Sequence, residues 1–116
     1  MINDALRQEL QAMRDEDLRV RAELVASGDL EGEYVPQMEG VHKRHASRLR
    51  ELIDRHGWPS EDIAGKGGSE AAWRIAQHAI GEPEFQRQVL KMLHASMARG
   101  QVPPWQAAYL EDRIAM

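Results

Sequence analysis

Two of the five histidines lie on one face of a long helical segment. His42 and His45 are three residues apart, a spacing that places both side chains on the same side of a helix. Together with His78 and an aspartate, either Asp17 or Asp112, they offer donors that suit zinc, iron and manganese. The chain has no His-Glu-x-x-His motif. The alternative interpretation is therefore that these histidines are half-buried residues at the edges of helices.

His78 follows Gln77 near the end of a short helical segment. Two residues separate it from Gly81, where the helix breaks. A histidine in this position can act as a general acid or base when a carboxylate tunes its proton affinity. It can equally close the helix by a hydrogen bond to the backbone. Asp112 is a candidate for the orienting carboxylate, and Arg113 for an anion clamp. The alternative for this pair is an ordinary charge pair at the surface.

Asp17 interrupts an apolar stripe of the first helical segment. A charge at such a position needs a partner. Arg21 is one helical turn further on and is the nearest candidate. An inward-facing Arg113 is a second candidate.

Aromatic residues and glycines surround His78 in the sequence. Trp58, Trp73 and Trp105 each lie near a loop or a helix start, and they suit either a core or the lining of a cleft. The run Gly65-Lys66-Gly67-Gly68-Ser69 lacks the order of a phosphate-binding P-loop, and no strand precedes it. We therefore expect this run to be a connector and hinge before a helix.

Composition excludes several classes of protein. The net charge is −4, the sequence pI is about 5.7, and no run of Lys or Arg exceeds two residues, which argues against nucleic acid as a partner. No apolar run approaches the ~20 residues of a membrane-spanning helix. The chain has no cysteine, and its start lacks the pattern of a signal peptide. We expect a cytoplasmic protein.

The elements that must position these groups are helices. Apolar residues recur at three- and four-residue steps, and no convincing period-two alternation predicts a strand. We expect one all-α domain over residues 1–116, a compact bundle of about five helices, two long N-terminal and three shorter C-terminal. The predicted segments run from Asn3 or Asp4 to Ser27, Pro36 to His56, about 69–80 and Pro83 to Gly100, and Pro103-Pro104 separates a final helix that carries Trp105. A polar connector is expected over 28–35.

Several short motifs resemble a bacterial domain-of-unknown-function family, DUF6624. They occur in order over residues 10–114: Gly57-Trp58-Pro59, Ala71-Ala72-Trp73, Gln77-His78-Ala79, Phe85-Gln86 and Tyr109-Leu110-x-Asp112-Arg113. The polar residues of the family pattern correspond to Asp17, Arg21, Gln77, His78, Gln86, Asp112 and Arg113. The resemblance implies that these side chains converge on one site, but it implies no particular reaction, cofactor or partner.

The C-terminus departs from the family pattern. The pattern continues after Asp-Arg with a Gln-x-Tyr-Gly-Thr-Gln tail, whereas this sequence ends at Ile114-Ala115-Met116. If the tail completes the pocket in the family, we expect a shortened, altered or inactive form here.

Three hypotheses follow. The first is a pocket between helices that binds a small molecule or a peptide, built from Asp17, Arg21, His45, Trp58, Trp73, Gln77, Gln86 and Arg113. The second is a hydrolase or transferase with His78 and Asp112 as catalytic groups, in a metal-assisted version with His42 and His45 as ligands. The third is an interaction module, for example a homodimer that pairs through the segment 36–56. The sequence identifies no cofactor.

Overall fold

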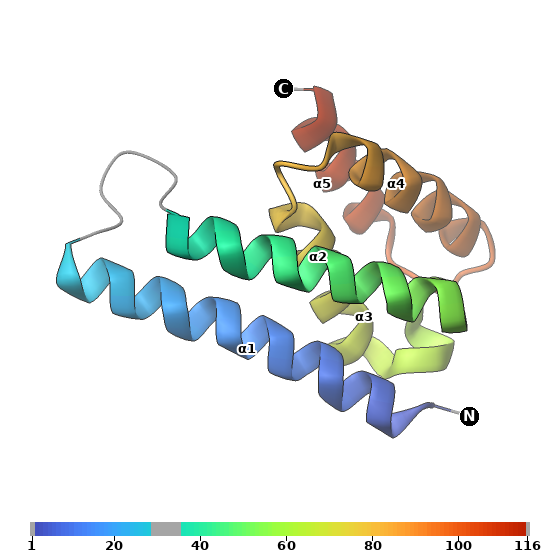
Figure 1. The fold of residues 1–116 in the computed structure, drawn as a ribbon. Helices are drawn as coiled ribbons and strands as arrows, with labels where there is room; N and C mark the ends of the chain where they lie inside the picture. Colours follow the sequence, from blue (N-terminus) through green and yellow to red (C-terminus); the bar gives the residue numbers. More distant parts are fainter. Residues whose placement is uncertain (1, 29–35, 116) are drawn as a thin grey trace.

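The computed structural model describes residues 2–28 and 36–115, apart from the side chain of Ala115. Within these residues the chain forms five helices and no strand (Figure 1): α1 (Asp4–Ser27), α2 (Pro36–His56), α3 (Glu61–His78), α4 (Pro83–Ala98) and α5 (Pro104–Ala115). The predicted all-α bundle with two long N-terminal helices is confirmed. The connector expected over 28–35 lies, beyond Gly28, outside the described residues.

The two long helices form an antiparallel pair (Figure 1). At the start of α1, the side chain of Asn3 accepts a hydrogen bond from the backbone N–H of Leu6, as expected for a helix cap. At its end, Gly28 adopts a left-handed conformation with φ of 81°. Apolar residues of both helices then line the core, among them Leu10 and Leu49, which are fully buried.

The third helix differs from the sequence-based expectation. It begins at Glu61 rather than near residue 69, and Gly65 bends it with φ of 71° and ψ of 172°. Gly67 and Gly68 lie within the helix, so the glycine run is not a connecting loop. Gly68 is buried beside Arg7 of α1, and only a residue without a Cβ lets the two helices approach this closely.

Prolines set the starts of the last two helices. Pro83 and Pro104 are the first residues of α4 and α5, where the missing backbone N–H costs nothing. α4 ends at Ala98, two residues before the predicted end, and packs against α5. Buried apolar residues of this pair complete the core: Phe85, Val89, Leu93, Ala107 and Leu110. No helix in the described ranges is both long and apolar enough to cross a membrane.

Candidate functional site

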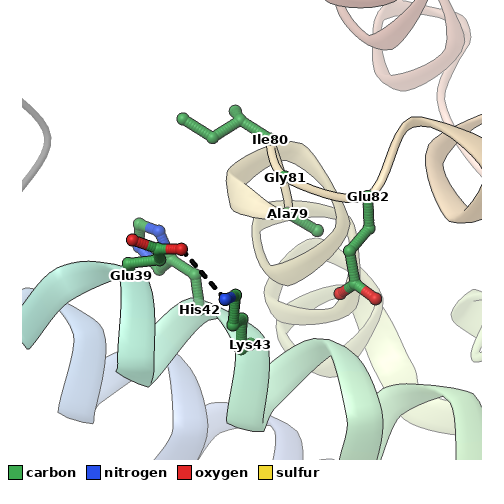
Figure 2. Close-up of a pocket in the computed structure, with 7 residues that line it drawn as sticks. All are labelled: Glu39, His42, Lys43, Ala79, Ile80, Gly81 and Glu82. Carbon is green, nitrogen blue, oxygen red and sulfur yellow. Dashed lines mark ion pairs between the residues drawn. The ribbon is translucent and has the colours of Figure 1, made fainter. Parts of the chain in front are cut away.

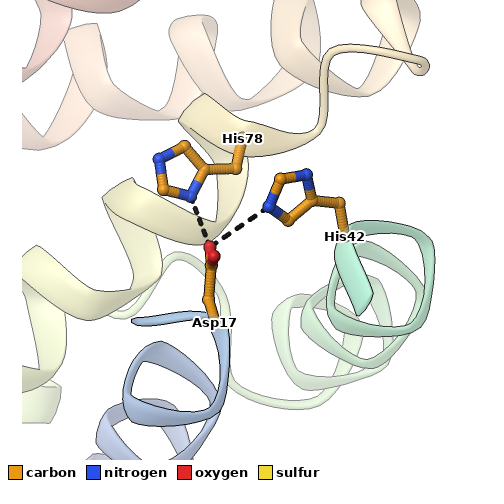
Figure 3. A group of neighbouring side chains, drawn as sticks. All are labelled: Asp17, His42 and His78. Carbon is orange, nitrogen blue, oxygen red and sulfur yellow. Dashed lines mark hydrogen bonds and ion pairs between the residues drawn. The ribbon is translucent and has the colours of Figure 1, made fainter. Parts of the chain in front are cut away.

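Three polar side chains from three helices meet inside the bundle. Asp17 comes from α1, His42 from α2, and His78 is the last residue of α3. His78 Nδ1 lies 2.5 Å from Asp17 Oδ2, and His42 Nε2 lies 3.2 Å from the same oxygen. Figure 3 shows both imidazoles directed toward this carboxylate. We call these three residues the Asp17 cluster; Asp17 and His42 are buried and His78 is half-buried.

The cluster keeps Asp17 ionised. Burial by itself would raise the pKa of Asp17, because a buried carboxylate loses its hydration. The contacts and charges of His42 and His78 outweigh this effect and lower the pKa of Asp17 well below its ordinary value. An ionised carboxylate can only accept, so His78 Nδ1 donates the hydrogen bond. Arg21, the partner expected from sequence, lies further away, with Nη2 at 3.9 Å from Oδ1.

A hollow of about 310 Å³ opens above the cluster. It is lined by Arg21, His42, His78, Ile80 and Arg113, and we call it the cationic hollow. Its two guanidinium groups carry two positive charges, and the carboxylate of Asp17 contacts its lining.

A second hollow of about 180 Å³ shares His42 and Ile80 with the first one. Figure 2 shows its lining, in which the segment after α3 faces one side of α2. The lining residues are Glu39, His42, Lys43, Ala79, Ile80, Gly81 and Glu82. Its charges already have partners: Lys43 pairs with Glu39 at 2.9 Å, and Glu82 pairs with Arg50 at 2.8 Å. This hollow therefore offers mainly the apolar surface of Ala79 and Ile80.

Asp112 does not join His78. It is exposed on α5 and lines a different hollow, of about 280 Å³, with Gln77, Tyr109 and Arg113. The carboxylate that contacts His78 is Asp17, because the end of α3 faces α1 and α2. Arg113 borders both this hollow and the cationic hollow. Of the two neighbouring residues expected to converge with His78, Arg113 therefore lines the cationic hollow and Asp112 does not.

His45 is also directed away from the cluster. Its Nε2 lies 2.6 Å from Glu16 Oε1, and Arg44 contacts the same oxygen at 3.0 Å. Burial lowers the pKa of His45 more than Glu16 raises it, while the hydrogen bond from His45 lowers the pKa of Glu16. His42 and His45 share a helix face, as expected, but they have different partners. Sequence reasoning missed Glu16, since nothing in α1 marks it as a partner of α2.

Three other predicted site residues have structural contacts. Gln86 donates from Nε2 to the carbonyls of Ala76 at 3.0 Å and Gln77 at 3.2 Å, and so caps the end of α3. Trp73 donates from Nε1 to the carbonyl of Gln106 at 2.9 Å and is part of the core. Trp58 is buried in the core near the start of α3, at the opposite end from His78.

The family comparison covers almost the whole sequence. Residues 4–116 match the model of a family of unknown function, DUF6624. The chain belongs to this family. No curated protein matches the chain, and no solved structure matches it.

The residues that the DUF6624 resemblance singled out have different positions in this fold. Arg21, His78 and Arg113 line the cationic hollow, and Asp17 contacts His78. Gln86 acts on the backbone that carries His78. Ile80 was missed, because an isolated apolar residue after a helix gives no signal of a binding role.

Proposed function

We propose that this DUF6624 protein binds a small anionic molecule in the cationic hollow. The observation that carries the proposal is the convergence of Arg21, Arg113, His42 and His78 on one hollow. Arg113 is exposed and forms no ion pair with another described residue, so its guanidinium is available to a ligand. Arginine is well suited to phosphate and carboxylate groups, since its donors bind two oxygens at once.

The size and surroundings of the hollow limit the ligand. A volume of about 310 Å³ is at the small end for binding pockets. The neighbouring hollow shares His42 and Ile80 with this one and adds the apolar surface of Ala79. The ligand class that fits is a metabolite-sized molecule with a phosphate or carboxylate group and a short apolar part.

Binding can be tested with three probes: inorganic phosphate, phenyl phosphate and phenol. Histidine ring signals in NMR spectra report on ligands beside His42 and His78. We expect phenyl phosphate to bind most tightly, phosphate more weakly, and phenol not at all. Replacing Arg113 by Gln removes a charge-assisted hydrogen bond of about 1.5–3 kcal/mol, so affinity should fall roughly 10- to 100-fold.

A matched variant separates this site from general charge attraction. Arg87→Gln removes the same charge from an exposed position on α4, where Arg87 pairs with Glu84. Affinity should stay within about twofold of the natural chain after this change, because surface charges act weakly over distance. Equal losses in both variants, or equal binding of phenol and phenyl phosphate, would contradict the proposal.

A second candidate function is hydrolysis or group transfer on the bound anion. It is favoured by the contact between His78 and Asp17, because a carboxylate on Nδ1 holds a histidine in place for proton transfer from Nε2. In this candidate Asp17 takes the orienting role that the sequence suggested for Asp112. Turnover of phenyl phosphate should then be lost in His78→Gln and retained in Asp112→Asn. Turnover that is retained in His78→Gln and lost in Asp112→Asn would instead assign the catalytic role to Asp112.

A cytoplasmic location in bacteria and a homodimer remain predictions. His42 and His45 of α2 are buried against the other helices of the same chain. A dimer would therefore use other residues than these two. Light scattering of the purified chain tests whether one forms.

A further inference from the structure

We propose that Asp17, His42 and His78 form a binding site for a divalent transition metal ion, with zinc as the first candidate. One ligand atom from each residue can be chosen so that all three lie within 4.8 Å of one another. The three atoms come from α1, α2 and the end of α3, so only the assembled bundle brings them together (Figure 3). The inference goes beyond anion binding and holds whether or not an anion binds.

The donor set matches the chemistry of zinc. Two imidazole nitrogens and one carboxylate oxygen are ligands typical of zinc sites that keep a position open. Zinc binds these atoms at about 2.0–2.2 Å, so neighbouring ligands of a tetrahedral site are separated by about 3.4 Å. The contact of 3.2 Å between His42 and Asp17 is close to this value. His78 Nδ1, at 2.5 Å from Asp17, would move outward by less than the width of an atom.

A second observation points to a ligand at the same place. Asp17 is 5% exposed, and its Oδ1 is buried without a hydrogen-bond partner among the described residues. A buried carboxylate oxygen without a donor is costly. The nearest cation, Arg21, is 3.9 Å away, beyond hydrogen-bond distance. A metal ion beside the carboxylate can bind one or both oxygens.

The surroundings leave room for an open position on the metal. His42 and His78 both line the cationic hollow, so a fourth ligand can enter from that side. The guanidinium groups of Arg21 and Arg113 repel a metal ion, but both side chains are exposed enough for water to screen them. An anion in the hollow would offset the added charge.

Metal binding can be measured directly on the full-length chain. The purified protein is stripped with a chelator and titrated with zinc by calorimetry in phosphate-free buffer. Cobalt serves as the spectroscopic probe, since its visible absorption reports ligand geometry. We expect one metal ion per chain. His42→Gln and His78→Gln should each lower the affinity about 100-fold or more, since even residues that only support metal ligands contribute about 10- to 100-fold.

Two neighbouring histidines provide matched controls. His45→Gln removes a buried histidine one turn away on the same helix, and His94→Gln removes an exposed one that pairs with Glu111. Both variants should bind zinc as the natural chain does. His78 is only half-buried, so His78→Gln keeps the test valid even if the His42 variant fails to fold; circular dichroism checks folding.

Three results would overturn the inference: no saturable zinc binding, unchanged binding in His78→Gln, or an equal loss in His94→Gln. Failure of this site is distinguishable from failure of anion binding. Phenyl phosphate is titrated into the metal-free chain, where only the cationic hollow is tested. Zinc is titrated without any phosphate.

Discussion

Gln86 fixes the end of α3 and thereby the position of His78. Its amide donates to the carbonyls of Ala76 and Gln77, two of the last carbonyls of the helix, which have no partner within the helix itself. The side chain is only 4% exposed, so water cannot easily replace it. Gln86 is therefore a positioning residue for the cationic hollow, without touching the hollow itself.

Replacing Gln86 by Glu tests this role, because the shape is kept and the donor is lost. We expect the free energy of unfolding to fall by about 1–3 kcal/mol, since the carbonyl of Gln77 loses the donor supplied by Gln86 and the carbonyl of Ala76 keeps only the backbone N–H of Ala79. The affinity for phenyl phosphate should fall as well, because His78 is no longer held. Gln88→Glu, an exposed change on the same helix, is the control for charge. Urea denaturation measures the difference, and equal effects of both changes would refute the assignment.

At the scale of single residues, the sequence predicted which side chain requires a partner better than it predicted which residues supply one. It indicated that Asp17 requires a partner, because the charge interrupts an apolar stripe. The partners found are mainly His42 and His78, which lie on other helices. The sequence grouped these histidines with an aspartate as possible metal ligands, but spacing within one helix could not decide between Asp17 and Asp112. The sequence suggested Asp112 as the carboxylate for His78, whereas Asp17 is the carboxylate that contacts His78 in this structure. A catalytic role for Asp112 stays a prediction. Arg113 lines the cationic hollow, and its role in anion contact stays a prediction.

At the scale of elements, the glycines of α3 allow α1 and α3 to pack closely. A Cβ at Gly68 would lie 2.9 Å from Ala64 Cβ and 3.3 Å from Arg7 Cα. One at Gly67 would lie 2.4 Å from Gln11 Nε2, the end of a flexible side chain. Gly68 is therefore the position at which backbone meets backbone, and the spacing of the two helices depends on it.

Gly68→Ala should destabilise the fold by about 1–3 kcal/mol from overpacking, less the ~1 kcal/mol that alanine gains over glycine in a helix. Gly40→Ala is the matched control, since Gly40 is exposed in α2 with no atom within 4 Å of the added Cβ. This control should be stabilising by up to about 1 kcal/mol. Thermal and urea unfolding measure both variants. Stabilisation by both would mean that the helix contact at Gly68 is loose.

The same glycines explain why one helix was predicted incorrectly. Prolines, caps and apolar spacing predicted α2 and the starts of α4 and α5, because these signals act within a few residues of the chain. Gly65-Lys66-Gly67-Gly68 has the local composition of a loop, and local signals predict one. Gly68 and Gly67 lie close to Arg7 and Gln11, which are far away in the sequence, and this packing favours a helix instead.

At the scale of the whole molecule, ion pairs connect the two long helices along their length. Arg48 of α2 donates from Nε and Nη2 to both carboxylate oxygens of Glu9 in α1, at 2.5 and 3.1 Å. The hydrogen bond from Arg48 lowers the pKa of Glu9, against the opposing effect of burial. Because the pKa is lower in the folded chain, the pair stabilises the fold above the ordinary pKa of Glu9. This contribution is lost as the pH falls through the folded value.

Glu9→Gln should therefore lower the free energy of unfolding at neutral pH by about 0.5–1 kcal/mol, as expected for a partly exposed pair. The difference from the natural chain should vanish in acid, where Glu9 is protonated. Urea denaturation at neutral and acidic pH measures it. Glu23→Gln, which breaks an exposed pair within α1, is the control and should have little effect at either pH. A difference that persists in acid would show that the pair does not act through charge.

The origin of Asp17, His42 and His78 on three separate helices has a thermodynamic consequence. An unfolded chain cannot hold these groups together, so an occupant of this place binds the folded state only. Its binding free energy then adds to the free energy of unfolding, by about 2.7 kcal/mol at a concentration of 100 times Kd. The melting temperature of the chain therefore rises with occupancy, and candidate ions and metabolites can be ranked by thermal unfolding.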